Sequence, residues 1–141
     1  MRDHGCDLGF AQDMDADRLA VVDERGRPIG EEFTLLLACR RVLSVPPGPV
    51  VTNVATTHAL EAVAAAPGCT VTRSPVGEAN VTEAMRRVGA VIGGEGNGGV
   101  IYPPINFARD SLVGMALILH HLAADGRPLS ALVAEIPALV M

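Results

Sequence analysis

The fold class of this chain is decided by the stretch VVTNVATTHALEAVAAAPGCTVT, residues 50–72. It begins with a run of β-branched residues, 50–54, that favours a buried strand. An alanine-rich segment follows, which predicts a helix ended by Pro67-Gly68, and residues 69–72 then predict a second strand. Strands and helices that alternate with short loops are typical of a parallel or mixed sheet covered by helices.

The same alternation extends in both directions from this stretch. Upstream we expect strands at 7–11 and 19–23 and a helix from Gly30. Downstream we expect, in order, a loop at 73–77, a helix at 78–87, a short strand at 90–92, a glycine-rich loop at 93–99, and helices at 110–124 and 128–139.

Composition limits the class of protein. The chain has 141 residues, of which 49% are hydrophobic, enough to build one good core. Its longest apolar runs fall far short of the roughly 20 residues that cross a bilayer, so we expect no membrane span. The N-terminal residues contain no apolar signal segment, and the 3 cysteines have neither zinc-site nor disulfide-scaffold spacing. We therefore expect a reducing, cytoplasmic location.

The charge pattern argues against nucleic acid as a partner. The net charge is −5, and all 11 basic side chains are arginines that are scattered along the sequence. With 3 Phe, 1 Tyr and no Trp, there are also few rings on which bases could stack.

The most informative polar stretch is Asp13-Met14-Asp15-Ala16-Asp17-Arg18. In an extended or curving backbone alternate side chains point the same way, so the three carboxylates are expected to converge. At about 4 Å each pair repels by roughly 4 kcal/mol at an effective dielectric of about 20, and a divalent cation removes that penalty. Oxygen ligands favour Mg²⁺ or Ca²⁺. A solvated turn remains an alternative, whereas an EF-hand loop is disfavoured because Arg18 stands where that loop needs glycine.

Two polar loops, 73–77 and 93–99, follow predicted strands, where open α/β sheets bind ligands. Residues 94–99 fit G-x-G-x-x-G, but Val-Ile-Tyr-Pro-Pro follows and cannot open the helix that a dinucleotide site needs. We expect a flexible glycine cradle in which Glu95 and Asn97 bind the vicinal hydroxyls of a sugar. A glycine-rich turn with incidental polar residues is the alternative.

Several other charged residues are ambiguous in the sequence. A cap or surface-pair role is as good an interpretation as a site role for Arg73, Glu78, Arg109 and Asp110.

Three motifs together resemble the α-D-phosphohexomutase family of phosphoglucomutases, phosphomannomutases and phosphoglucosamine mutases. They are DLGFAQDMDADR at 7–18, RSPVGE at 73–78 and GEGNGG at 94–99. The resemblance covers nearly the whole chain. It implies that residues 1–27 are the end of the second of four domains and that 28–141 are the third, a three-layer α/β/α domain with a mixed sheet. The sequence of residues 76–80 and 95–103 is most like the phosphoglucosamine mutase-like branch.

The resemblance also implies a set of site residues. Asp13, Asp15 and Asp17 would bind Mg²⁺ together with a phosphoserine located elsewhere in the enzyme. Arg18 would lie beside the transferred phosphoryl group. The implied substrate contacts are Glu95, Asn97, Arg73 and Gly77. The implied reaction is a reversible phosphoryl shift on a hexose phosphate, of glucosamine, mannose or glucose, through a bisphosphate intermediate.

Two departures from the family pattern limit what this chain can do. Pro75 replaces a lysine that many members have as a candidate proton shuttle, and no phosphoserine motif is present. We therefore expect the chain to need the remaining mutase domains as partners, to be inactive alone, and to bind Mg²⁺ in the millimolar range or weaker. The alternative is a non-catalytic Mg²⁺ or sugar-phosphate module, or a regulatory paralogue. A phosphatase with an aspartate nucleophile would need a lysine or its equivalent, which this sequence lacks.

Overall fold

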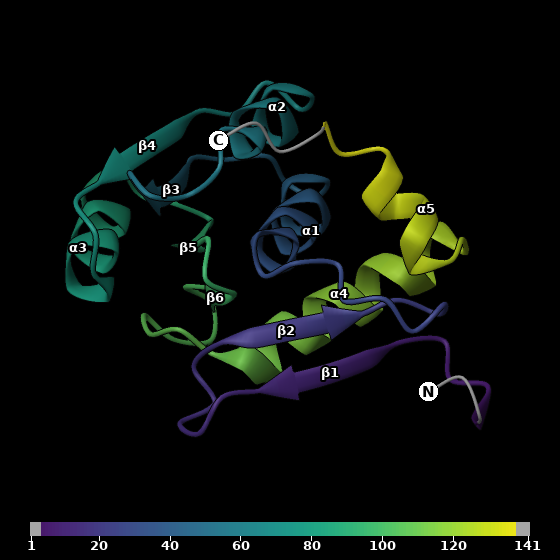
Figure 1. Ribbon diagram of the computed structural model, residues 1–141. Coiled ribbons are helices and arrows are strands. Elements are labelled where there is room, and N and C mark those ends of the chain that lie inside the picture. Colours follow the sequence, from purple (N-terminus) through teal and green to yellow (C-terminus); the bar gives the residue numbers. More distant parts are fainter. Residues whose placement is uncertain (1–3, 138–141) are drawn as a thin grey trace.

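The computed structural model describes residues 4–137, and in this part of the chain eleven helices and strands are formed (Figure 1). Their bounds are β1 Gly9–Gln12, β2 Leu19–Val22, α1 Glu32–Leu43, β3 Val50–Asn53, α2 Ala59–Ala65, β4 Val71–Ser74, α3 Glu78–Val88, β5 Ile92–Glu95, β6 Gly99–Ile101, α4 Ser111–Asp125 and α5 Leu129–Ala134.

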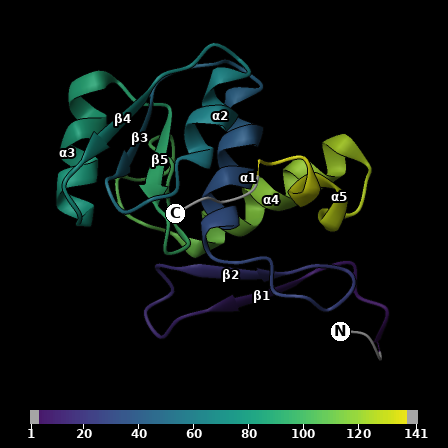
Figure 2. The same cartoon turned by 45° about the horizontal axis from the view of Figure 1, so that its top comes forward.

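A mixed four-stranded sheet in the order β4-β3-β5-β6 forms the middle layer. Strand β3 is parallel to both β4 and β5, and β6 runs antiparallel to β5 at the edge. Helix α3 covers one face, whereas α1 lies on the other with α2 and α4 beside it (Figures 1 and 2). The predicted α/β/α fold with a mixed sheet is therefore confirmed.

Helix α1 lies at the centre of the larger core. The side chains from Leu35 to Cys39 are all fully buried, although they are consecutive in the sequence. A helix can bury every side only if it is surrounded, and α1 contacts the sheet, α2, α4 and α5. A smaller core beneath α3 joins Val51 and Ile101 to Val81 and Met85.

The separate hairpin β1–β2 packs beneath α1 and α4 (Figure 2). Its residues Leu19 and Val21 are buried in the same core as α1. The segment expected to be the end of a neighbouring domain therefore shares its hydrophobic core with the α/β layers.

The predicted strand at 69–72 was placed too early. The chain turns at Gly68 after α2, and the Cys69 amide still donates to the Ala64 carbonyl at 2.8 Å. Cys69 is thus used to close the helix, and β4 begins at Val71. As a result Arg73 and Ser74, expected in a loop, are the last residues of a strand.

The prediction of a flexible glycine cradle at 93–99 was also wrong. Gly93 and Gly94 are buried inside β5, and the segment is a β-hairpin with its turn at residues 96–98. A Cβ on Gly93 would lie 2.6 Å from the Met85 sulfur and 2.7 Å from the Val51 carbonyl oxygen. The glycines therefore let β5 pack closely between α3 and β3.

The last predicted helix, 128–139, was too long. Helix α5 ends at Ala134, because the residue before Pro137 is disfavoured in helical conformation. Residues 138 and 139 of that prediction lie outside the described part of the chain. Within residues 4–137, none of the helices combines the length and apolar character needed to cross a bilayer.

Candidate functional site

The acidic loop, residues 13–18, joins β1 to β2 and brings three carboxylates together. Oxygen atoms of Asp13, Asp15 and Asp17 all lie within 4.8 Å of one another. Of the two backbone shapes that the sequence left open, extended or curving, the loop adopts a curving one. The Ala16 amide donates to the Asp13 carbonyl at 3.2 Å, and Ala16 has a φ of 58°. A tight turn therefore folds the carboxylates toward one point.

Ser111, the first residue of α4, fixes this loop to the α/β layers. Its hydroxyl donates to the Ala16 carbonyl at 2.6 Å and accepts from Gln12 Nε2 at 2.6 Å. The side chain is buried. Sequence reasoning gave Ser111 no role, because nothing in its local sequence indicates a partner almost a hundred residues away.

Arg18 closes the loop over Asp13. Its Nε donates to Asp13 Oδ2 at 2.7 Å, and its backbone amide donates to Oδ1 at 3.1 Å. Burial alone would raise the pKa of Asp13, but the hydrogen bonds from Arg18 outweigh it and lower that pKa below its ordinary value. Half of the Arg18 side chain remains exposed, so its guanidinium can also meet a group arriving from solvent.

Asp17 lies between two arginines, Arg109 and Arg18. Its Oδ2 pairs with Arg109, whereas its Oδ1 is buried, lies 3.5 Å from Arg18 Nε and accepts no hydrogen bond from residues 4–137. Burial and the adjacent Asp13 carboxylate raise the pKa of Asp17, and the Arg109 charge offsets only part of that rise. A buried carboxylate oxygen without a hydrogen bond, next to two further carboxylates, fits a hard divalent cation such as Mg²⁺.

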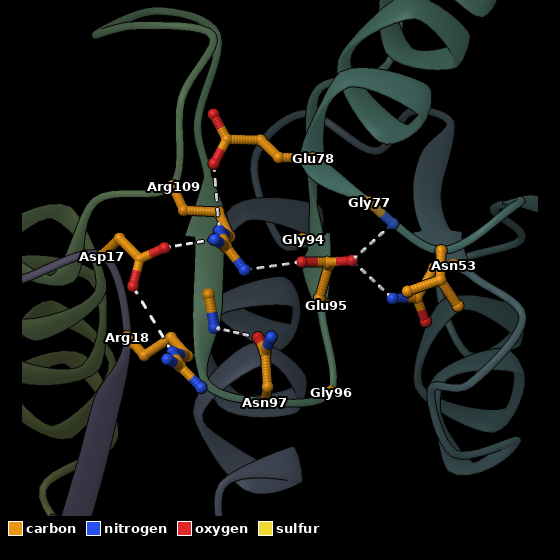
Figure 3. Close-up of polar contacts among 12 residues, drawn as sticks. Asp17, Arg18, Asn53, Gly77, Glu78, Gly94, Glu95, Gly96, Asn97 and Arg109 are labelled. Carbon is orange, nitrogen blue, oxygen red and sulfur yellow. Dashed lines mark hydrogen bonds and ion pairs between the residues drawn. The ribbon is translucent and has the colours of Figure 1, made fainter. Parts of the chain in front are cut away.

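Glu95 ends β5 and is almost completely buried. Its Oε1 accepts from Asn53 Nδ2 at 2.6 Å and from the Gly77 amide at 3.2 Å, and its Oε2 accepts from Arg109 Nη1 at 2.7 Å (Figure 3). These three donors compensate the cost of burying the carboxylate. Gly77 has a φ of 118°, which favours glycine where the backbone turns into α3.

Arg109 joins the two predicted halves of the site. In addition to Glu95 it contacts Asp17 through Nη2, and its Nε donates to Glu78 Oε2 at 3.0 Å (Figure 3). Sequence reasoning left Arg109 undecided between a surface pair and a site role. The sequence indicated only that the acidic side chains of the site need a positively charged partner. It could not show which of the 11 arginines is that partner.

Asn53 was missed as well, although a signal existed. It is the last residue of β3, at the same edge of the sheet where β5 ends in Glu95. The Thr56 hydroxyl and the Ala55 amide donate to Asn53 Oδ1 at 3.0 Å each, which aims its Nδ2 at Glu95.

A backbone hydrogen bond holds the start of β2, directly after the acidic loop, against the β5–β6 turn. The Leu19 amide donates to the Gly98 carbonyl at 3.1 Å. Asn97 in this turn accepts from the Gly99 amide at 3.2 Å through Oδ1. It lines both a cleft shared with Asp13 and Arg18 and a groove shared with Glu95.

The groove beside Glu95 has a volume of about 540 Å³, enough for a hexose phosphate. Glu32 also lines it, and burial raises the pKa of Glu32 although the Thr57 amide donates to its carboxylate. The predicted site residues that line the groove are Gly77, Glu95 and Asn97.

Arg73 is placed differently from these residues. Its guanidinium donates to the Glu61 carboxylate at 2.8 and 2.9 Å and to the carbonyls of Asn53, Thr56 and Thr57. The side chain therefore braces the loop between β3 and α2, and it is not among the residues that line the groove.

Comparison with known proteins shows which family the chain is similar to. Residues 30–140 match the family described as phosphoglucomutase/phosphomannomutase, alpha/beta/alpha domain III. A probable phosphoglucosamine mutase of Methanopyrus kandleri is 41% identical over 94% of this chain and 29% of its own length. A phosphoglucomutase/phosphomannomutase of Thermococcus kodakarensis is 40% identical over 94% of this chain and 29% of its own length.

A solved structure shows the same fold. The crystal structure of a putative phosphomannomutase from Thermus thermophilus superposes with a TM-score of 0.83 and 34% identity, covering 92% of this chain and 30% of that one. The chain thus spans about 30% of the length of the relatives it matches. Since the family match extends over most of the sequence and the fold agrees with it, the chain belongs to the phosphoglucomutase/phosphomannomutase family.

Proposed function

We propose that this chain is the metal- and sugar-recognising part of a phosphohexomutase that acts on glucosamine, mannose or glucose phosphate. The observation that carries the proposal is the Arg109 guanidinium, which contacts Asp17 of the acidic loop and Glu95 of the groove. Two motifs about eighty residues apart are thereby parts of one polar centre. The names of the relatives, phosphoglucosamine mutase and phosphoglucomutase/phosphomannomutase, support the reaction class.

In this proposal Asp13, Asp15 and Asp17 hold Mg²⁺, which offsets negative charge on the phosphoryl group in transfer. Arg18, half exposed beside them, donates hydrogen bonds to the phosphoryl oxygens. A phosphoserine contributed by another mutase domain is the phosphoryl donor, and the second phosphate of the bisphosphate returns to that serine.

In this proposal the sugar binds in the groove beside Glu95. Glu95 Oε1 already accepts two hydrogen bonds, whereas Oε2 accepts one, from Arg109, and can accept another from a sugar hydroxyl; the Asn97 amide nitrogen can donate to a neighbouring hydroxyl. Together they suit adjacent hydroxyls of a hexose. In our proposal Arg73 acts indirectly. It donates to the backbone carbonyl of Asn53, and the Asn53 side chain in turn positions Glu95.

The purified 141-residue chain allows a direct test. We expect no interconversion of hexose phosphates by ³¹P NMR with Mg²⁺ and a hexose bisphosphate present, because no phosphoserine loop is available. By calorimetry we expect Mg²⁺ to bind in the millimolar range or weaker, since one ligand of the shell is missing. Turnover by the chain alone, or micromolar Mg²⁺ affinity, would contradict the proposal.

Weak sugar binding should depend on Glu95. In saturation-transfer NMR with glucosamine 6-phosphate, we expect Glu95→Gln to lose the signal on the ring protons. Glu83→Gln, an exposed carboxylate on α3, is the matched control and should retain it. Tight binding of sugar phosphate by the unmodified chain would instead favour a stand-alone binding module.

A further inference from the structure

Arg109 is the meeting point of three carboxylates that come from three different segments. Asp17 belongs to the acidic loop, Glu78 is the first residue of α3, and Glu95 is the last residue of β5 (Figure 3). About four fifths of the Arg109 side chain is buried, and the Glu95 side chain is only 4% exposed. The Arg109 contacts with Glu95 and Asp17 are therefore largely shielded from the solvent and salt that weaken surface ion pairs, whereas Glu78 is more exposed.

The guanidinium makes each of these contacts with a different nitrogen. Nη2 meets Asp17 Oδ2, Nη1 meets Glu95 Oε2 at 2.7 Å, and Nε meets Glu78 Oε2 at 3.0 Å. Because a guanidinium is planar and rigid, its nitrogens cannot move independently. Any change in how strongly Asp17 holds Nη2 must therefore alter the geometry or strength of the bond to Glu95.

Asp17 is also the carboxylate whose state a cation would change most. Its Oδ1 accepts no hydrogen bond from the described residues, while Oδ2 is engaged by Arg109. A cation bound at Oδ1 withdraws charge from the whole carboxylate. The attraction between Asp17 and Arg109 then weakens, and Arg109 is left more strongly paired with Glu95.

We propose that Arg109 is a positioning residue that transmits cation binding at Asp17 to Glu95 and, through Glu95, to the Gly77 amide at the start of α3. This inference rests on the proposed function, since it takes the acidic loop as a divalent cation site. By linkage, a ligand on Glu95 must change the cation affinity by the same factor that the cation changes the affinity of Glu95 for that ligand.

A second connection runs from the acidic loop through the backbone to the β5–β6 turn, and it does not reach Gly77. The hydrogen bond from the Leu19 amide to the Gly98 carbonyl joins the first residue of β2, directly after the acidic loop, to the β5–β6 turn. It does not include Gly77, whose amide donates to Glu95 Oε1. The Gly77 amide therefore reports the route through Arg109, whereas the Leu19 amide reports the backbone route.

The test is a titration of the ¹⁵N-labelled 141-residue chain with Mg²⁺ into the tens of millimolar, followed by amide NMR. In the unmodified chain we expect the amides of Ala16, Arg18 and Gly77 to shift with one common midpoint. In Arg109→Lys and Arg109→Gln we expect Ala16 and Arg18 still to shift, while the Gly77 shift falls several-fold. Lysine retains the charge but lacks the planar fork.

Arg86→Gln is the matched control. Arg86 lies over the Phe107 ring at 4.3 Å and no hydrogen bond or ion pair joins it to the Arg109 cluster within the described residues. Its loss removes one positive charge from α3 and should leave the Gly77 response unchanged. The Arg109 Nε–H signal of the unmodified chain is a further measurement that needs no variant, and it should shift with the Ala16 midpoint.

The outcomes separate the two proposals. If Ala16 and Arg18 do not shift in the unmodified chain, the cation site itself is wrong and this inference fails with it. If they shift while Gly77 and the Arg109 Nε–H signal do not, only the coupling is wrong. A Gly77 shift of undiminished size in both Arg109 variants would also overturn the coupling.

Discussion

The 11 arginines illustrate how one residue type serves different purposes in this molecule. Arg73 directs its donors to three backbone carbonyls and Glu61, so it stabilises a loop. Arg109 directs its donors to three carboxylates, so it joins segments that carry site chemistry. The absence of lysine suits both environments, because only a guanidinium offers several donors in a fixed plane.

His121 should make the fold less stable in mild acid. Burial is the main cause that lowers the pKa of this half-buried imidazole, and the positive charges of Arg40 and Arg41 lower it further. The negative charges of Asp125 and Glu135 raise it, but only in part. Its Nε2 is buried without a hydrogen-bond partner among residues 4–137. Because the unfolded chain binds this proton at a higher pH than the folded chain, the free energy of unfolding should fall as the pH drops from about 7.5 to about 5.5.

Urea denaturation at the two pH values measures this effect. His121→Gln should show a smaller loss of stability on acidification than the unmodified chain. His58→Gln, at an exposed position, is the control and should keep the full pH dependence. An unchanged pH dependence in His121→Gln would contradict the assignment.

At the scale of elements, the β5–β6 hairpin depends on glycines that leave room for other backbone segments. Gly98 has a φ of +91°, and a Cβ there would lie 2.5 Å from the Leu19 carbonyl oxygen. Gly89 after α3 has a φ of +65° with no atom within 4 Å of its would-be Cβ. These two positions separate backbone strain from a clash with a neighbouring segment.

Gly89→Ala should therefore cost about 1 kcal/mol of unfolding free energy, from the left-handed conformation alone. Gly98→Ala should cost about 3 kcal/mol or more, because the β5–β6 turn must also move away from the Leu19 carbonyl oxygen of β2. Thermal and urea denaturation of both variants give the comparison. Equal losses would show that the two loops are not packed as described.

Helix α4 begins with a side-chain cap that can be tested separately. Asp110 Oδ1 accepts from the Leu112 and Val113 amides at 2.9 and 3.1 Å. Asp110→Ala should lower the unfolding free energy by about 1 kcal/mol, because two helix donors lose their acceptor. Asp110→Ser keeps a capping oxygen and should recover most of that loss in the same urea experiment. Equal stability of the two variants would rule out a capping role.

At the scale of the whole molecule, the hairpin and the α/β layers form one packed unit. Leu19 and Val21 of β2 are buried among side chains of α1, and Ser111 bonds the acidic loop to α4. A shared core couples the unfolding of its parts. The hairpin should therefore not melt before the α/β layers do.

Native-state hydrogen exchange checks this expectation. The amides of Leu19 and Leu36 should exchange with the same free energy and the same dependence on denaturant. Leu19→Ala should lower both by about 2–5 kcal/mol, because the cavity it leaves lies in the shared core. Early exchange of Leu19 with Leu36 still protected would show that the hairpin is an independent unit.

Much of the fold followed from local patterns. The alternation of strands and helices could be predicted, because β-branched runs, alanine-rich segments and Pro-Gly pairs act locally, but these patterns left a parallel and a mixed sheet open and only the family resemblance implied the mixed one. The predicted element boundaries were wrong where tertiary contacts decide whether a residue belongs to a strand. Gly93 and Gly94 lie in a strand because α3 and α1 press on its two faces, and Cys69 is withdrawn from β4 by its bond to Ala64.

Local sequence was enough to indicate the oxygen-rich chemistry of the acidic loop, the presence of Glu95 and Asn97 in a glycine-rich segment, and the alternation that makes an α/β domain. The tertiary structure decided which groups meet. Asn53, Gly77 and Arg109 converge on Glu95 only because β3, α3 and the segment before α4 meet at one edge of the sheet. Contacts between residues far apart in sequence depend on packing that no local pattern encodes, and Arg109 is the clearest case.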